Sequence, residues 1–199
     1  MDYHLYHAIN QFTFHHPWLG DGLKVVEKWS VPLIVVGTVA LWLLARPRGE
    51  RKWKLAASSA LLAAGLALLV NRLIAQFWDR ARPYAGHPSA HVWGSRSQDP
   101  SFPSDHASAA FGIAFAVFCF DRLAGSIFLV AALVIGVGRV FVGVHYPMDV
   151  VAGIFVGLGA ALLVARVARP LVERLVGLLE RATDPLVAPL WNRLRPGRG

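Results

Sequence analysis

Charged residues are scarce in this chain. Only 16% of its 199 residues are Asp, Glu, Lys or Arg, whereas soluble domains carry about 25%. Hydrophobic residues make up 55% of the chain, and the mean hydropathy is +0.47. The length allows one domain of ordinary size, and the composition argues against a soluble one and indicates a membrane protein.

The chain has a single cysteine, and no basic segment precedes its first apolar residues. Cys119 is the only cysteine, which excludes an intramolecular disulfide, and its apolar surroundings suit a small core residue. The first ten residues, MDYHLYHAIN, lack the basic start of a cleavable signal peptide. The net charge is +8, but the basic residues cluster between apolar runs. This pattern suits anionic lipid and membrane orientation, so we expect membrane lipids and no nucleic acid as partners.

Long apolar runs are abundant. Crossing a bilayer as a helix takes about 20 apolar residues, with about 17 as the lower limit. Five segments qualify: residues 26–45, 55–78, 104–120, 123–141 and 147–165. Glycine, alanine and serine recur in them and allow close helix packing in lipid. The sequence therefore predicts an all-α fold, an integral membrane helical bundle with about five transmembrane helices.

The two ends of the chain are more polar than these five segments. Aromatic and aliphatic side chains in residues 1–20 suit a helix lying in the membrane interface, and a sixth span is the alternative. Residues 170–199 begin with leucines at helical spacing between charged residues, which favours an amphipathic helix on the membrane or on a partner. The predicted organisation is an interfacial helix (1–20), a transmembrane domain (21–169) and an amphipathic tail (170–199).

Lysine and arginine in the loops predict the orientation, because cytoplasmic loops carry an excess of both. One side holds most of the 20 basic residues: Arg46, Arg48, Arg51, Lys52, Lys54, Arg122 and the arginines from Arg166 onward. The other side holds Lys24, Lys28, Arg80, Arg82 and Arg96. We therefore expect a cytoplasmic tail, with the second group facing the periplasm or the cell exterior.

Three polar clusters stand at the ends of the predicted spans. They are residues 79–83 (DRARP), 102–106 (FPSDH) and 138–149 (GRVFVGVHYPMD). Because the chain alternates direction, all three should meet on the outward face at one depth. Ionisable groups at the edge of the hydrocarbon are costly and are typical of functional sites.

The residue types in these clusters suit phosphate chemistry. Arg82 and Arg139 can each bind phosphate oxygens through paired hydrogen bonds. Ser104 precedes a helical run, so it can cap that helix beside free backbone N–H groups that attract anions. His145 and Asp149 are four residues apart, so the carboxylate can orient the imidazole. His106 is placed to protonate a leaving group.

Each of these residues also has a structural alternative. Single arginines often anchor a helix in the interface, and Ser104 with Asp105 is the usual composition of a helix cap. A metal site built from both histidines, Asp105 and Asp149 is disfavoured, because the converging arginines repel a cation. We expect no metal and no cofactor.

Taken together, the clusters resemble the motifs of the type 2 phosphatidic acid phosphatase superfamily, which read Lys-x6-Arg-Pro, Pro-Ser-Gly-His and Ser-Arg-x5-His-x3-Asp. Residues 82–83 match the end of the first motif and residues 103–106 match the second, with Asp105 in place of glycine. Residues 138–149 match the third, with Gly138 in place of serine. The resemblance covers roughly residues 55–165.

One departure concerns phosphate binding. The lysine of the first motif would fall at Ala75, so this contact is missing or supplied by another group. Arg80 is the first candidate for that role, and Arg72 is a weaker one because it lies a turn deeper. The set of phosphate-binding candidates is therefore Arg80, Arg82, Ser104, Asp105 and Arg139.

The resemblance implies a mechanism in which His145 attacks phosphorus, Asp149 supports it and His106 protonates the leaving group. A covalent phosphohistidine and independence of metal are implied as well. The Arg-x-Arg-Pro and Phe-Pro-Ser-Asp-His variants are similar to the branch that contains bacterial undecaprenyl pyrophosphate phosphatases. The expected activity is hydrolysis of a polyprenyl pyrophosphate to the monophosphate, which recycles the carrier lipid for cell-wall synthesis.

Three alternatives stay open beside that activity. The first is a phosphatase of phosphatidic acid or phosphatidylglycerol phosphate, with the same site and a different lipid slot. The second is the soluble vanadate-dependent haloperoxidases that share the motifs, against which five apolar segments argue. The third is an inactive lipid-binding or transport protein, which would need neither His106 nor His145. The sequence leaves the oligomeric state open.

Overall fold

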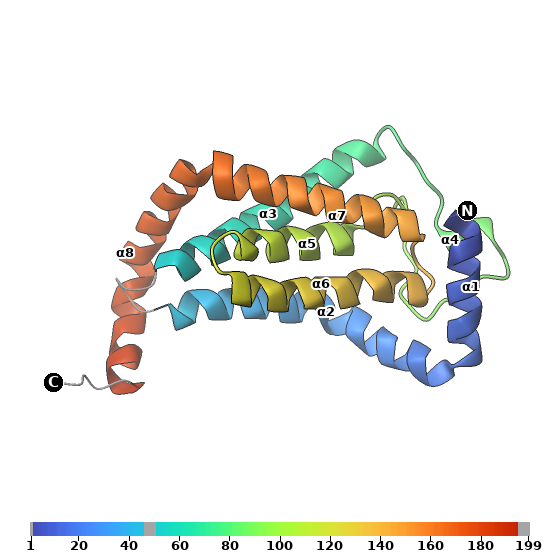
Figure 1. Ribbon diagram of the computed structural model, residues 1–199, viewed down its shortest axis with the longest axis horizontal. Helices are drawn as coiled ribbons and strands as arrows, with labels where there is room; N and C mark the ends of the chain where they lie inside the picture. Colours follow the sequence, from blue (N-terminus) through green and yellow to red (C-terminus); the bar gives the residue numbers. More distant parts are fainter. Residues whose placement is uncertain (1, 46–50, 195–199) are drawn as a thin grey trace.

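The computed structural model describes residues 2–45 and 51–194, and this part of the chain is all-helical (Figure 1). The helices are α1 (Asp2–His15), α2 (Pro17–Leu44), α3 (Arg51–Ala75), α4 (Pro83–Gly86), α5 (Asp105–Phe118), α6 (Arg122–Phe141), α7 (Pro147–Leu162), the π-helical η1 (Leu163–Val167) and α8 (Arg169–Leu194). The predicted helical bundle is thus confirmed. Arg46, Arg48, Arg195 and Arg198, which entered the orientation prediction, lie outside the described residues.

Four of the described helices are long and apolar enough to cross a membrane. They are α2, α3, α6 and the continuous segment Pro147–Val167, which joins α7 and η1. The third predicted span is present as α5, but α5 has only 14 residues, fewer than a bilayer requires. It starts at the polar pair Asp105–His106 and ends at a turn before Asp121, so the helix is shorter than the apolar run.

Helix α5 forms the centre of the bundle. It packs against α3, α6 and α7, and most of its side chains are buried (Figure 1). A Cβ atom at Gly157 of α7 would lie 2.7 Å from both the Gly112 nitrogen and the Ser108 oxygen of α5, so only glycine allows this approach. The close contact holds α5 and α7 side by side, and the first turns of both helices carry predicted site residues.

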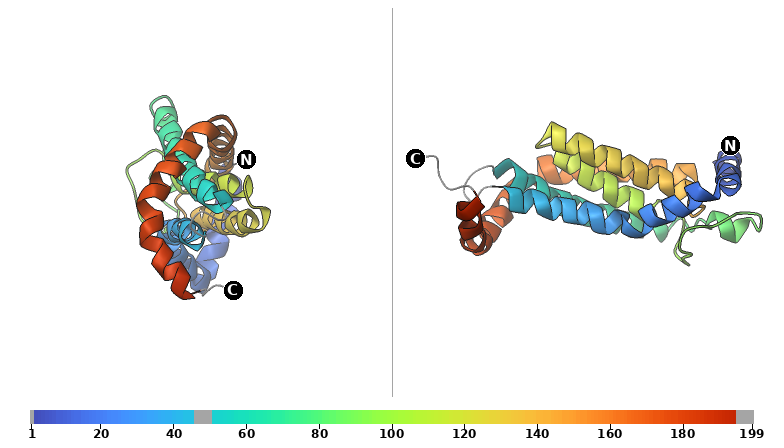
Figure 2. Two further views of the ribbon diagram at one scale, coloured as in Figure 1. Left: turned by 90° about the vertical axis from the view of Figure 1, so that its left-hand side faces the viewer. Right: turned by 90° about the horizontal axis from the view of Figure 1, so that it is seen from below.

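Two helices cross the ends of the bundle rather than follow its axis. Helix α1 crosses the end where α5 and α7 begin, and α8 crosses the opposite end (Figures 1 and 2). The predicted domain boundary after residue 20 falls inside the continuous helix α2, whereas the predicted tail begins one residue after the start of α8. The placement of α1 and α8 in the membrane interfaces stays a prediction.

Candidate active site

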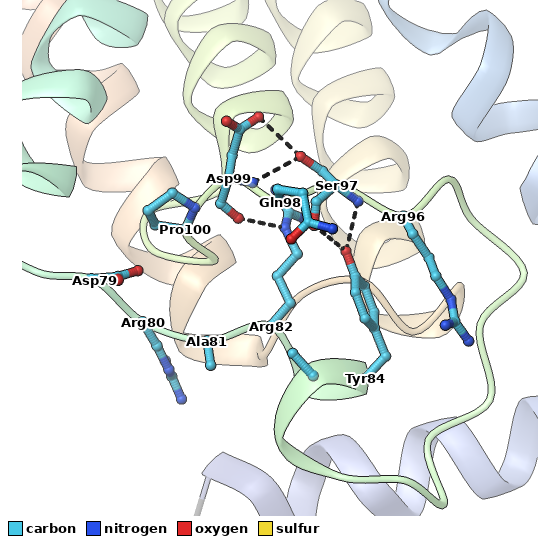
Figure 3. A pocket seen from close by; sticks show the side chains of 11 residues that line it. Asp79, Arg80, Ala81, Arg82, Tyr84, Arg96, Ser97, Gln98, Asp99 and Pro100 are labelled. Atoms are coloured by element: carbon cyan, nitrogen blue, oxygen red, sulfur yellow. Dashed lines mark hydrogen bonds between the residues drawn. The ribbon is translucent and has the colours of Figure 1, made fainter.

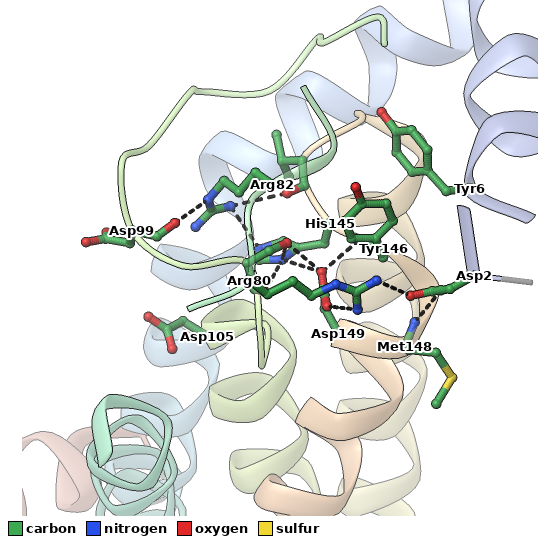
Figure 4. A network of polar contacts seen from close by, with 12 residues as sticks. Asp2, Tyr6, Arg80, Arg82, Asp99, Asp105, His145, Tyr146, Met148 and Asp149 are labelled. Carbon is green, nitrogen blue, oxygen red and sulfur yellow. Dashed lines mark hydrogen bonds and ion pairs between the residues drawn. The ribbon is translucent and has the colours of Figure 1, made fainter. Parts of the chain in front are cut away.

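The three polar clusters meet at the bundle end that α1 crosses (Figure 4). The backbone N–H of Ser104 donates to the carbonyl oxygen of Asp149 at 3.0 Å, which joins the start of α5 to the first turn of α7. Pro147 occupies the first position of α7, where no N–H partner is needed. This arrangement brings the second and third motifs into direct contact.

His145 is held with one ring nitrogen available for attack. Its side chain is 2% exposed, and Nδ1 lies 2.9 Å from the carbonyl oxygen of Ser101. Because a carbonyl oxygen only accepts, Nδ1 must carry the proton and Nε2 must carry the lone pair. Nε2 lies 3.2 Å from the Arg82 guanidinium. This is the tautomer that a nucleophilic histidine needs.

Asp149 supports His145 through an intermediary. The distance between its Oδ2 and His145 Nδ1 is 3.5 Å, too long for a strong hydrogen bond. The same oxygen accepts the Ser101 hydroxyl at 2.6 Å and the Tyr146 N–H at 2.8 Å. The spacing in the sequence predicted a direct contact, whereas in the structure Ser101 bridges the two side chains. It donates its hydroxyl to Asp149 and offers its carbonyl oxygen to His145.

Burial determines the charge state of His145. Burial is the main cause that lowers the pKa of its imidazole to about 4; Asp149 acts to raise this pKa, and the positive charges of Arg139 and Arg82 act to lower it. The side chain is therefore neutral at neutral pH, as a nucleophile must be.

Two buried polar atoms in this cluster have no hydrogen-bond partner. They are Nε of Arg139, whose side chain is 6% exposed, and the hydroxyl of Ser104. Ser104 occupies the predicted cap position of α5, but its side chain makes no capping bond. Since buried polar atoms are almost always paired, each of these two is a candidate donor to a bound anion.

The other predicted phosphate-binding residues have protein partners. Arg80 donates to Asp149 at 2.7 Å and to Asp2 of α1 at 2.6 Å, and it lies over the Tyr146 ring. These partners raise the pKa of Arg80 although burial alone would lower it. Arg82 donates to the carbonyl oxygens of Asp99 and Val144 as well as facing His145. A phosphate role for Arg80 remains a prediction.

Asp105 and His106 share the first turn of α5 but differ in surroundings. Asp105 is exposed, accepts an N–H of Asn71 at 2.7 Å and lies apart from the network around Asp149 (Figure 4). His106 is half-buried and lies within electrostatic range of Arg82, Arg139 and His145. The roles of His106 as the acid and of Asp105 as a phosphate ligand remain predictions.

A polar hollow lies on the loop side of the site. It has a volume of about 390 Å³ and is lined by residues 79–82, 84–85 and 96–100 (Figure 3). Arg80, Arg82 and Arg96 contribute three cations to its wall, and Tyr84 is held by hydrogen bonds with Ser97. Arg82 thus stands between this hollow and His145.

Several residues of the site were not predicted from the sequence. Ser101 is one, and Glu27 of α2 is another: its carboxylate accepts from Arg139 at 2.7 Å and from the Ser95 N–H at 3.2 Å. Asp2 is a third, because it holds Arg80 and also accepts the Met148 N–H at the start of α7. Within residues 2–45 and 51–194, no group of three or more His, Cys, Asp or Glu side chains is placed to hold a metal ion.

Comparison with known proteins identifies the family of this chain. The sequence profile of the PAP2 superfamily matches residues 56–172, so the chain belongs to this superfamily. Undecaprenyl-diphosphatase BcrC of Bacillus subtilis is 28% identical over 189 residues, which cover 94% of this chain and 95% of that protein. Bacitracin transport permease protein BcrC of Bacillus licheniformis is 28% identical over 181 residues, covering 90% and 87%.

A solved structure is also similar. The transmembrane PAP2 type phosphatidylglycerolphosphate phosphatase of Bacillus subtilis superimposes with a TM-score of 0.59 at 25% identity, covering 80% of this chain and 82% of that one. The chain is therefore a multi-pass membrane hydrolase that acts on lipid phosphates.

Proposed function

We propose that this enzyme hydrolyses undecaprenyl pyrophosphate, or a similar polyprenyl pyrophosphate, to the monophosphate at the outer face of the cytoplasmic membrane. The observation that carries the proposal is the Nε2 lone pair of His145, which faces Arg82 in a cluster with unpaired donors on Arg139 and Ser104. Similarity to undecaprenyl-diphosphatase BcrC along nearly the whole chain supports this substrate. The activity would recycle the carrier lipid for cell-wall synthesis.

The first half of the reaction transfers the phosphoryl group to the protein. Nε2 of His145 forms a bond to the terminal phosphorus while the bond from phosphorus to the bridging oxygen breaks. Ser101 and Asp149 stabilise the positive charge that develops on the imidazole. Arg82, Arg139, the Ser104 hydroxyl and the free N–H groups at the start of α5 neutralise the phosphoryl oxygens. His106 gives its proton to the departing prenyl phosphate.

The second half releases inorganic phosphate. A water molecule loses a proton to His106 and attacks the phosphorus of phosphohistidine, and the nitrogen–phosphorus bond breaks. The electron pair of that bond returns to Nε2, so both histidines end in their starting states. The polar hollow beside Arg82 offers a route for the water and for the phosphate.

Phosphate release by the purified protein in detergent tests the proposal. Undecaprenyl pyrophosphate, phosphatidic acid and phosphatidylglycerol phosphate are compared side by side in EDTA, and we expect the first to have the highest kcat/KM. Vanadate, which mimics the pentacoordinate transition state, should inhibit. A preference for phosphatidylglycerol phosphate would support the second candidate, which rests on the similar solved structure. Activity that EDTA abolishes and one metal ion restores would refute the metal-independent mechanism.

Cysteine labelling tests the outward orientation. After Cys119→Ala removes the native thiol, Ser95→Cys near the site should react with a membrane-impermeant maleimide in intact cells. Arg122→Cys, at the start of α6 on the opposite side, should react only after the cells are opened. The reverse pattern would place the site in the cytoplasm and overturn the proposed location.

A further inference from the structure

An apolar groove runs along the bundle between α2 and α6. It has a volume of about 410 Å³, and every residue that lines it is apolar or glycine except Ser30. The Ser30 hydroxyl donates to the Glu27 carbonyl at 3.0 Å, so it offers no free donor to a polar ligand. Leu33 and Ile127 on the rim are 64% and 63% exposed, so the groove opens sideways to the surroundings of the bundle.

One end of this groove leads to the site. A narrow hollow of about 10 Å³, which we name the neck, lies between the groove and Arg139 and is also lined by Leu23 and Glu27. Val26, Ser30 and Ile135 line both the neck and the groove, so the two hollows adjoin. Side chains close the neck, and Gly138, where the family motif has serine, adds no side chain to it. Binding of a lipid here requires the side chains that line the neck, Leu23 and Glu27 among them, to move.

We infer that the groove between α2 and α6 holds the hydrocarbon tail of the lipid substrate, with the phosphate end at Arg139. This inference rests on the proposed function. The groove is apolar along its length and reaches a cation only through the neck, which matches an amphiphile with an anionic head. Ile127 and Arg139 are twelve positions apart on α6, or about 18 Å at about 1.5 Å per residue. That exceeds half of the about 30 Å hydrocarbon core, so a headgroup at the site places its tail deep in the bilayer.

Two variants narrow the groove from opposite walls. Ala131 is an exposed lining residue of α6, and Ala131→Phe fills the space beside it. Gly37 lies on α2, where a Cβ atom would already be 3.3 Å from the Phe128 ring, so Gly37→Leu fills the groove from the other side. The matched control is Val130→Phe, because Val130 is 64% exposed, lies next to Ala131 and does not line the groove.

Each variant is assayed with two substrates in detergent. Undecaprenyl pyrophosphate has a tail that fills the groove, whereas the five-carbon isopentenyl pyrophosphate is too short to pass the neck. We expect both groove variants to lose about tenfold or more in kcat/KM for the long substrate, as pocket narrowing by several methylene groups would. For the short substrate they should stay within about twofold of the wild type, and Val130→Phe should match the wild type with both.

The outcomes separate this inference from the proposed function. Full activity of both groove variants on undecaprenyl pyrophosphate would mean that ordinary membrane lipid fills the groove, and the inference would be wrong. Equal losses on both substrates in both variants would also contradict it, because the groove would then act on the site itself. A wild type that hydrolyses neither pyrophosphate would refute the proposed function and this inference with it.

Discussion

Two buried cations lie at opposite ends of the bundle, and they differ in how many partners the surrounding residues provide. Lys54, at the end crossed by α8, is 2% exposed and is paired with Glu180 at 3.2 Å and Asp184 at 2.7 Å. Arg139, at the end crossed by α1, is 5% exposed and is paired with Glu27 alone, and its Nε has no partner. The two side chains are about equally buried, but only Lys54 has its hydrogen-bonding and charge partners complete.

The difference separates a structural cation from a binding cation. Removing a charge from water is costly, and the fold compensates Lys54 fully with two carboxylates, which also fasten α8 to α3. At the other end of the bundle, Nε of Arg139 has no hydrogen-bond partner, and neither has the buried hydroxyl of Ser104. Buried donors without a partner are rare, and we interpret these two as donors for a ligand. The two ends should therefore respond to mutation in opposite ways.

The largest effect on activity is expected at the two histidines of the end that carries Arg139. His145→Ala removes the nitrogen that we propose attacks phosphorus, so kcat should fall by about 10⁴-fold or more, and no acid-labile, base-stable phosphoprotein should form. His106→Ala should slow substrates with poor leaving groups far more than nitrophenyl phosphate, whose leaving group needs no proton. Single-turnover assays with labelled substrate measure both.

A phosphoprotein in His145→Ala would show that another residue is the nucleophile. Equal losses on both substrate types in His106→Ala would contradict its role as the acid. The thermal unfolding midpoint of each variant serves as the control for correct folding.

The two cations themselves give the next largest contrast. Arg139→Lys keeps a positive charge opposite Glu27 but loses the planar fork, so kcat/KM should fall by about 10²–10³-fold with little change in stability. Lys54→Met should lower stability and leave activity unchanged, because it removes the cation that pairs with Glu180 and Asp184. We expect the free energy of unfolding to fall by about 2–3 kcal/mol while kcat/KM stays near that of the wild type.

The matched control for the second variant is the half-exposed pair at the same end. Lys52→Met should change stability less than Lys54→Met, because Lys52 is 53% exposed in its pair with Asp121. If Lys54→Met lowered activity as strongly as Arg139→Lys, the division between a structural end and a binding end would be wrong.

The titration of His145 should appear in the pH dependence of stability. Its pKa is lowered to about 4 in the folded protein from the usual value of about 6.5, so the unfolded chain binds the proton more readily. The stability gained from the neutral ring is complete above about pH 6.5 and is lost as pH falls toward 4. Between pH 7 and pH 4 the wild type should therefore lose about 2–3 kcal/mol relative to His145→Gln. Parallel curves for the two proteins would contradict the lowered pKa.

The smallest effect is expected at Ser101. Ser101→Ala removes the hydroxyl that donates to Asp149 but keeps the carbonyl oxygen that accepts from His145. We expect kcat to fall by about tenfold with KM unchanged, as loss of one orienting hydrogen bond would give. Ser101→Thr, which restores a hydroxyl, should recover part of the rate. A change in KM alone would mean that Ser101 acts on binding rather than on the orientation of His145.

The sequence predicted the fold better than it predicted the site's inner contacts. Apolar length alone located all five helices of the bundle, and the spacing in the third motif located His145 and Asp149 at the start of α7. Length could not show that α5 is shortened and enclosed by its neighbours, because enclosure depends on which helices pack together.

The missed residues share one physical property. Glu27 meets Arg139 across 112 positions, and Asp2 meets Arg80 across 78. Residues this far apart in the sequence form no periodic pattern or motif from which their contact could be predicted. A single acidic residue in an apolar helix does not identify its partner either. Ser101 was missed for another reason, since half of its contribution comes from its main-chain carbonyl, which every residue type carries.

Asp149 is also the last of the site residues to leave the ribosome. It follows Arg80 by 69 positions and Ser101 by 48, and the side chains of both residues donate hydrogen bonds to its carboxylate. At about 5–20 residues per second, roughly 3–14 seconds separate the synthesis of Arg80 from that of its partner. A chain truncated before His145 lacks both the proposed nucleophile and the Asp149 carboxylate that closes the site. Biosynthesis thus yields no half-active intermediate, because the catalytic centre is completed in one late step.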